Sequence, residues 1–134
     1  WYKVFESTRF YTYIQRLVRY YKTNDIIVQG EAIGRFNGNH HNLKQDEIRL
    51  FNIYVNGKRL LPLEFWKTFT HLDIPICPFY NKETLNHSMD EILQMSQIND
   101  SLNPKVPIEG LVWRCVDDGF SFKVINNDYL LKHE

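Results

Sequence analysis

The feature that most constrains the fold is a strand-like run that ends directly in Asn-Gly. The run Ile48–Val55 (IRLFNIYV) is rich in β-branched and aromatic side chains, and Asn56-Gly57 follows at once. Asn-Gly adopts the left-handed conformations that a two-residue hairpin turn requires, so Arg59-Leu60-Leu61 is predicted to return beside the run. The chain is therefore expected to contain an antiparallel sheet.

A second hairpin is predicted from the runs PIEGLVWRCV and FSFKVIN, which are joined by Asp117-Asp118-Gly119. If this segment is a three-residue loop with Gly119 left-handed, Trp113 lies opposite Lys123. Lys123 and Glu109 then share one face of the hairpin, because side chains alternate along a strand. A two-residue loop would put them on opposite faces. We predict the three-residue loop.

Three helices are predicted from local signals. Apolar residues recur at three- and four-residue steps over residues 7–22, with Ser7 or Thr8 as the N-cap. Pro62 suits the first turn of a helix over residues 62–72. Ser88-Met89-Asp90-Glu91 is a capping box that begins a helix ending near residue 98.

These elements together predict an α+β fold with antiparallel sheets and about three helices. A further β-rich segment covers residues 26–36, and Asn37-Gly38-Asn39 is expected to form a turn. The residues expected to be buried are Ile27, Leu50, Ile53, Phe65, Leu111 and Val124.

The composition is that of an ordinary globular chain. The 134 residues carry 16 Lys and Arg and 16 Asp and Glu, so we expect one neutral domain and not a general coat for DNA or RNA. No run approaches the roughly 20 apolar residues of a membrane-spanning helix. Cys77 and Cys115 lack the spacing of a zinc site, and we expect two core residues in a reducing cytoplasm.

Several common catalytic motifs are absent from the sequence. There is no GxxxxGKS or GxxxxGKT loop, no GxGxxG ahead of a helix, and no HExxH or GxSxG. His40 and His41 are adjacent, so on a strand their side chains would point in opposite directions and would not share a metal. We expect an exposed pair in a loop.

Four patterns follow one another in a fixed order, and through them the chain resembles the ATP-dependent RNA ligases. That family belongs to the covalent nucleotidyltransferase superfamily, with DNA ligases and mRNA capping enzymes. The resemblance covers almost the whole chain and implies that residues 1–134 are part of a nucleotidyltransferase (ligase adenylation) domain. Gly30-Glu31 resembles the family's Gly-Glu pattern ahead of motif III, and Phe51-Asn52-Ile53 resembles motif III. Glu109-Gly110-Leu111-Val112 resembles motif IV, and Ser121-Phe122-Lys123-Val124-Ile125-Asn126 resembles motif V.

The resemblance implies a role for each site residue. Glu31 would accept hydrogen bonds from ribose hydroxyls, Phe51 would line the adenine pocket, Glu109 would bind Mg²⁺ or Mn²⁺, and Lys123 would contact the α-phosphate of ATP. A hard divalent cation keeps most of its waters and needs only one or two carboxylates. Many relatives have an aromatic residue three positions before Phe51, where this chain has Ile48. Either Ile48 covers the adenine, or the assignment of Phe51 is displaced.

The chain also departs from the family pattern. The family forms its lysyl-AMP intermediate on a Lys-x-Asp-Gly motif, which these residues lack, and we expect the chain to start after that segment. By itself it should not self-adenylate. Many relatives carry a second lysine at the position of Ile125, so phosphate binding depends on Lys123 alone or on Arg114 or Lys132.

The resemblance implies ATP and a divalent metal as cofactors, and RNA ends as partners. The intact enzyme would adenylate its lysine, transfer AMP to an RNA 5′-phosphate, and join that end to a 3′-hydroxyl. A DNA ligase or capping-type core is a weaker alternative, because Tyr129-Leu130-Leu131 after the last motif looks more like RNA ligases. A non-catalytic module that binds nucleotide or RNA is a third hypothesis.

Overall fold

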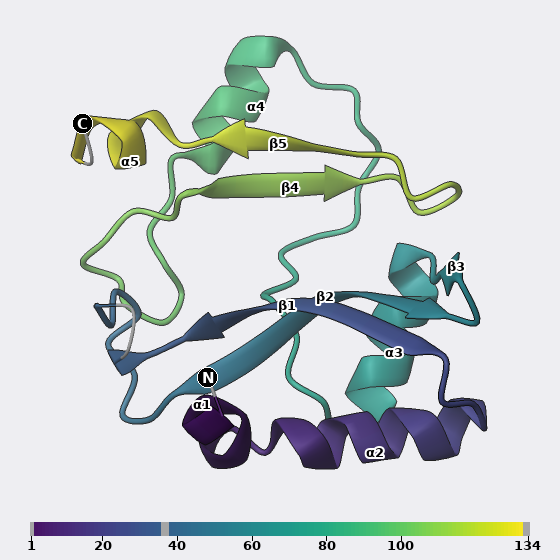
Figure 1. Cartoon of the computed structure of the whole chain (residues 1–134). Coiled ribbons are helices and arrows are strands. Elements are labelled where there is room, and N and C mark those ends of the chain that lie inside the picture. Colours follow the sequence, from purple (N-terminus) through teal and green to yellow (C-terminus); the bar gives the residue numbers. More distant parts are fainter. Residues whose placement is uncertain (1, 36–37, 133–134) are drawn as a thin grey trace. The chain divides into compact units, whose positions relative to one another are not determined.

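The computed structural model describes residues 2–35 and 38–132. The chain divides into two compact units, each of which we describe by itself. The first unit is Trp1–Asn39 with Leu43–Pro78, and the second is His40–Asn42 with Phe79–Glu134. The elements of both units are labelled in Figure 1.

The first unit contains a three-stranded antiparallel sheet in the order β1-β2-β3. Asn56 (φ 51°) and Gly57 (φ 79°) both have positive φ, as a two-residue hairpin turn between β2 and β3 requires. The Asn-Gly prediction is therefore confirmed. The strands are β1 (Ile26–Ile33), β2 (Glu47–Val55) and β3 (Lys58–Arg59).

The helices of the first unit are α1 (Tyr2–Ser7), α2 (Phe10–Tyr21) and α3 (Pro62–His71). The helix predicted over residues 7–22 begins later, at Phe10, because Arg9 adopts a left-handed conformation with φ 62°. The separate helix α1 before it was not predicted. The Thr8 hydroxyl donates to the carbonyl of Val4 at 2.6 Å and does not cap α2. The predicted N-cap is wrong, since this hydroxyl bonds back to the end of α1.

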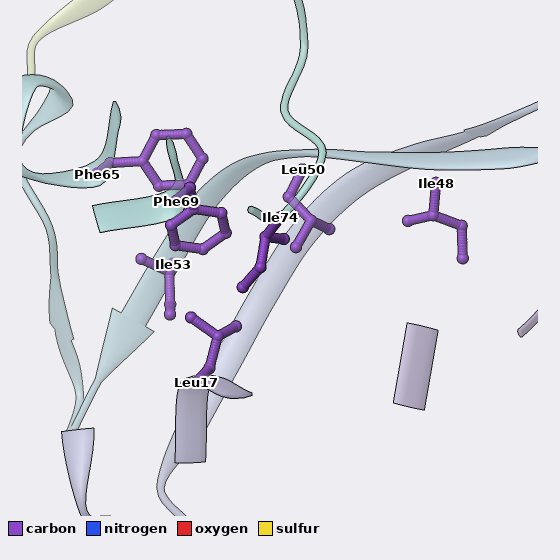
Figure 2. Close-up of a cluster of buried hydrophobic side chains, with 7 residues drawn as sticks. All are labelled: Leu17, Ile48, Leu50, Ile53, Phe65, Phe69 and Ile74. Carbon is purple, nitrogen blue, oxygen red and sulfur yellow. The ribbon is translucent and has the colours of Figure 1, made fainter. Parts of the chain in front are cut away.

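The core of the first unit lies where α2 and α3 pack on the sheet (Figure 2). Burial is confirmed for Leu50, Ile53 and Phe65. Ile27 is 58% exposed, and its predicted burial is wrong. Val28 pairs with the buried Ile53, so the alternation of the strand directs Ile27 to the other face of the sheet. The buried cluster consists of Leu17, Ile48, Leu50, Ile53, Phe65, Phe69 and Ile74.

The second unit contains a two-stranded antiparallel hairpin with a helix beside it (Figure 1). The Ser88 side chain accepts a hydrogen bond from the Glu91 N–H and donates one to Glu91 Oε1, so the predicted capping box is confirmed. Leu111 and Val124, expected to be buried, are half-buried. The elements are α4 (Met89–Ser96), β4 (Gly110–Arg114), β5 (Ser121–Ile125) and α5 (Asn127–Lys132).

The predicted α+β class with antiparallel sheets is confirmed. The described residues form five helices and not about three, because α1 and α5 have only six residues each and are too short for a periodic pattern. Cys77 is half-buried and Cys115 is exposed, so the expectation that both lie in a core is wrong. No helix within 2–35 or 38–132 has the length and apolar character needed to cross a membrane. Asn37 of the predicted turn lies outside the described residues.

Candidate functional site

The β1–β2 ladder contains a bulge at the predicted motifs. Gln29 pairs with Asn52 whereas Gly30 pairs with Leu50, so the register shifts by one residue at Phe51. A bulge changes the direction of the side chains beside it, and bulges are frequent next to active sites. Phe51 is half-buried at this irregularity.

Glu31 is exposed on the face of the sheet opposite the core. Its cross-strand partner is Arg49, whereas the neighbouring positions Ile48 and Leu50 point to the core. Arg49 donates from Nε to Glu47 Oε2 at 3.0 Å, so the charge of Arg49 is compensated by Glu47. Among the described residues Glu31 has no ion-pair partner. Its carboxylate oxygens are therefore placed to accept hydrogen bonds from a ligand.

Gly30 leaves no room for a side chain. A Cβ atom at this position would lie 2.6 Å from the carbonyl oxygen of Arg49 and 2.6 Å from Cδ2 of Leu50. Both distances are far below ordinary van der Waals contact, so only glycine lets the strands approach this closely at the bulge. Gly30 thereby allows the close strand approach that determines the backbone position of the neighbouring Glu31.

Ile48 is a core residue of the first unit. It is 6% exposed and belongs to the buried cluster that contains Leu17. Because side chains alternate along β2, Ile48 and Glu31 lie on opposite faces of the sheet. The hypothesis that Ile48 covers the adenine is therefore not supported, and Phe51 is kept as the candidate.

The β4–β5 hairpin has a longer loop than predicted. Lys123 lies opposite Val112, one residue away from the predicted register. Residues 116–119 form a four-residue connection in which the Gly119 N–H donates to the Cys115 carbonyl at 2.9 Å. Gly119 has φ 78°, as predicted, but the three-residue loop is wrong.

The side chains of Glu109 and Lys123 nevertheless meet, with an ion pair between Lys123 Nζ and Glu109 Oε1. The observed register alone would put them on opposite faces, but Glu109 lies before β4 and the strand is irregular at Gly110. A Cβ atom on Gly110 would lie 2.2 Å from the carbonyl oxygen of Val124. In a regular strand Cβ points out of the sheet, so the pleat is interrupted at Gly110 and Glu109 turns toward Lys123. The predicted proximity is confirmed, although the loop length from which it was predicted is wrong.

Asn126 belongs to the motif V pattern, but its buried structural role beside Glu109 was not predicted from the sequence. It is 0% exposed, and its N–H donates to the Glu109 carbonyl at 2.8 Å. Its side chain donates to the Ile98 carbonyl at 3.4 Å and accepts from the Asp128 N–H at 3.0 Å. The signal was present in the sequence, since Asn126 is the last residue of the run FSFKVIN.

The described part of the chain has no cluster of three or more His, Cys, Asp or Glu side chains able to hold a metal ion. A hydrated Mg²⁺ or Mn²⁺ does not need such a cluster. The Glu109 side chain is 53% exposed, and its carboxylate offers hard oxygen ligands to such an ion. Glu109 therefore fits a hydrated divalent cation, which would compete with Lys123 for the Glu109 carboxylate.

His41 is not an exposed loop residue, which corrects the sequence expectation. His40 is exposed, but His41 Nδ1 contacts Asp100 Oδ2, and Asp100 is 8% exposed. The other Asp100 oxygen accepts from the Leu102 N–H at 2.8 Å. Partial burial raises the pKa of Tyr80, and the negative charge of Asp100 raises it further. Sequence reasoning missed this pair because its members are 59 residues apart.

Comparisons with known proteins identify the family. A family model described as RNA ligase matches residues 1–125. The RNA ligase of Naegleria gruberi with pyrophosphate matches at a TM-score of 0.82 and 34% identity, over 96% of this chain and 40% of that protein. A variant of that ligase with ATP and manganese gives the same values, and a variant with AMP and manganese has 33% identity at a TM-score of 0.82.

This chain spans about 40% of the length of these relatives. A comparison with curated protein sequences found no match. The family model nevertheless covers nearly all of the chain. The chain belongs to the RNA ligase family.

Proposed function

We propose that this chain is part of the nucleotidyltransferase domain of an ATP-dependent RNA ligase that joins RNA 5′-phosphate and 3′-hydroxyl ends through lysyl-AMP. The main support is the ion pair between Glu109 and Lys123. It places one carboxylate and one ammonium side by side at an exposed site, with side chains 53% and 43% exposed. These are the two charges needed to bind a divalent metal and a phosphate.

The spacing of the two residues also supports the assignment. One solved variant of the N. gruberi ligase replaces a glutamate by alanine and contains AMP and manganese. Another replaces a lysine fourteen positions later and contains ATP and manganese. Glu109 and Lys123 are also 14 residues apart.

In this proposal each residue has a distinct task. Lys123 Nζ holds the α-phosphate and stabilises the negative charge that develops there during AMP transfer. The Glu31 carboxylate accepts hydrogen bonds from the ribose hydroxyls, and Phe51 lies against the adenine. Glu109 holds Mg²⁺ or Mn²⁺, which when bound acts as a Lewis acid on the phosphate oxygens.

The nucleophile comes from elsewhere in this proposal, because the 134 residues contain no Lys-x-Asp-Gly. Mixing the chain with a peptide that carries Lys-x-Asp-Gly and with labelled ATP is expected to give lysine-linked AMP on the peptide. ATP binding without lysine-linked AMP would favour the non-catalytic nucleotide-binding module instead. Supplying RNA or DNA ends to the adenylated mixture then distinguishes an RNA ligase from a DNA ligase.

The binding site itself is tested by equilibrium titration with ATP and Mn²⁺. Glu109→Ala and Lys123→Ala are each expected to weaken binding by about tenfold, because each loses a charge-assisted contact. Lys105→Ala is the matched control, since Lys105 is an exposed cation of the same unit outside the motifs. Unchanged affinity in both site variants would contradict the proposed pocket.

A further inference from the structure

Helix α2 carries an exposed stripe on the side that faces away from the core of the first unit. Tyr11, Gln15, Arg19 and Lys22 follow one another at helical spacing and are all exposed, so they lie along one face of the helix. Leu17, on the other side of α2, is 0% exposed and belongs to the buried cluster (Figure 2). We call the four exposed residues the α2 stripe.

The α2 stripe is part of a basic segment in a neutral chain. Residues 9–22 contain the cations Arg9, Arg16, Arg19 and Lys22 and have no Asp or Glu, although the whole chain has equal numbers of both charges. Among the described residues none of these four cations belongs to an ion pair. A surface with charge of one sign attracts a partner of the opposite charge, and this segment therefore suits a polyanion.

The cations of α2 differ in what they contact. Arg16 Nη1 donates to the carbonyl oxygens of Leu72 and Asp73, each at 3.1 Å, and the Arg16 guanidinium lies over the Tyr13 ring. Arg16 therefore holds α2 against the turn that follows α3. Arg19 lies three residues further along and is exposed, so its guanidinium can reach a phosphate group in solvent.

Exposed aromatic rings lie beside these cations. Tyr11 and Tyr20 are each 48% exposed. The Tyr20 ring lies 6.4 Å from the His71 ring of α3, so the surface continues from α2 onto the end of α3. Proteins that bind single-stranded nucleic acid combine cations, which contact the backbone, with aromatic side chains, on which bases stack. The α2 stripe and Tyr20 together offer both kinds of contact.

We propose that the α2 stripe and Tyr20 bind a single-stranded stretch of RNA. This inference rests on the proposed function for the identity of the polyanion, and it extends that function by naming a surface that holds the RNA. Arg19 and Lys22 contact phosphates, whereas Tyr11 and Tyr20 stack on bases. The surface is separate from the nucleotide site, because α2 packs on the core face of the sheet and Glu31 lies on the opposite face.

The test measures binding of a fluorescein-labelled oligouridylate of about 12 nucleotides by fluorescence anisotropy at several salt concentrations. Uridylate is used because it does not supply the adenine that the nucleotide site is proposed to bind. Arg19→Ala and Lys22→Ala are each expected to weaken binding by about fivefold at about 0.1 M salt and to reduce the salt slope by about 0.7. Lys44→Ala is the matched control, since Lys44 is an exposed cation of the same unit outside α2.

The tyrosines give a second readout that loss of charge does not produce. Tyr11→Ala is expected to weaken oligouridylate binding by about tenfold without changing the salt slope, because it removes a stacking surface and no charge. Tyr11→Phe keeps the ring and should retain the affinity. Urea unfolding of each variant shows whether it is folded, and Arg19→Ala still tests the surface if Tyr11→Ala is unfolded.

Three outcomes would overturn the inference, and they leave the proposed function to its own test with ATP. If Arg19→Ala and Lys22→Ala bind oligouridylate as the Lys44→Ala control does, the RNA lies elsewhere. If polyglutamate displaces the oligouridylate at equal charge and Tyr11→Ala has no effect, the surface attracts any polyanion, including an acidic protein, and is not an RNA site. If the unaltered chain binds ATP but no oligouridylate at low salt, the inference is wrong and the proposed nucleotide site stands.

Discussion

In the first unit seven apolar side chains form one buried cluster, whereas the buried side chains of the second unit are mostly polar. In the second unit Ile92 is the large apolar side chain that is buried among the described residues, at 7% exposure. Ser96, Asp100 and Asn126 are its buried polar residues. The stabilisation from apolar burial is distributed over many contacts, whereas the stabilisation from a buried polar network depends on each hydrogen bond being formed. The second unit should therefore be more sensitive to single polar substitutions.

The two units also present their candidate glutamates differently. Glu31 extends from a three-stranded sheet and has no ion-pair partner among the described residues, whereas Glu109 lies before a two-stranded hairpin and pairs with Lys123. In both cases the adjacent glycine, Gly30 or Gly110, has no space for a Cβ atom. Both units thus place a tightly packed glycine beside an exposed glutamate, one on a three-stranded sheet and the other on a two-stranded hairpin.

The largest expected effect is loss of the apolar core of the first unit. Phe69→Ala removes a 0% exposed ring, and we expect a loss of about 3–5 kcal/mol in the free energy of unfolding. Urea unfolding followed by circular dichroism measures it. Trp66→Ala on the same helix is the control, because Trp66 is 37% exposed and should cost much less. Equal losses for the two variants would contradict the contrast between core and surface.

Gly110→Ala is expected to have the next largest effect. The new Cβ would meet the Val124 carbonyl oxygen at 2.2 Å, so β4 and β5 must separate, at a cost of about 2 kcal/mol. The shift would also move Glu109 away from Lys123 and weaken ATP binding in the presence of Mn²⁺. Val112→Ala, on the exposed side of β4, is the control for both measurements. A Gly110→Ala variant as stable as the original chain would show that the backbone relaxes freely.

Asn126→Ala tests whether the second unit depends on buried polar contacts. It removes the bonds to the Ile98 carbonyl and the Asp128 N–H, and we expect a loss of about 1–3 kcal/mol. Asn127→Ala is the matched control, since Asn127 is exposed on the neighbouring position. If both variants unfold at the same urea concentration, the polar network does not stabilise the unit.

The smallest expected effect on stability is that of Glu109→Gln. The ion pair with Lys123 is about half exposed, and exposed pairs contribute only about 0–1 kcal/mol. The substitution also releases Lys123, so metal-free ATP should bind at least as tightly as it does to the original chain. A stability loss above about 2 kcal/mol would mean that the pair is structural and not a ligand site.

Local signals in the sequence predicted much of this fold. Asn56-Gly57 identifies a hairpin by its own backbone preference, and Ser88 with Glu91 identifies a helix start by two reciprocal hydrogen bonds. The positions of Glu31 and Phe51 at a bulge were not predictable, because the bulge appears only when β1 and β2 are paired.

The errors arise from the exact length of a loop, from a contact between distant residues, and from an unfavoured backbone conformation. One extra residue in the β4–β5 connection changes which residues face each other, and Gly119 is left-handed in either case. The pairing of His41 with Asp100 spans 59 residues, which no local pattern encodes. Arg9 adopts a left-handed conformation that its residue type does not favour, so α2 begins at Phe10 and not at residue 7.

The most direct test of the central claim is an NMR titration of the ¹⁵N-labelled chain with ATP and Mg²⁺. Amide shift changes are expected to concentrate at Glu31, Phe51, Gly110 and Lys123, and Lys123→Ala is expected to reduce them at equal ATP concentration. Changes confined to other residues, or no changes at millimolar ATP, would contradict the assignment of these residues to a nucleotide site.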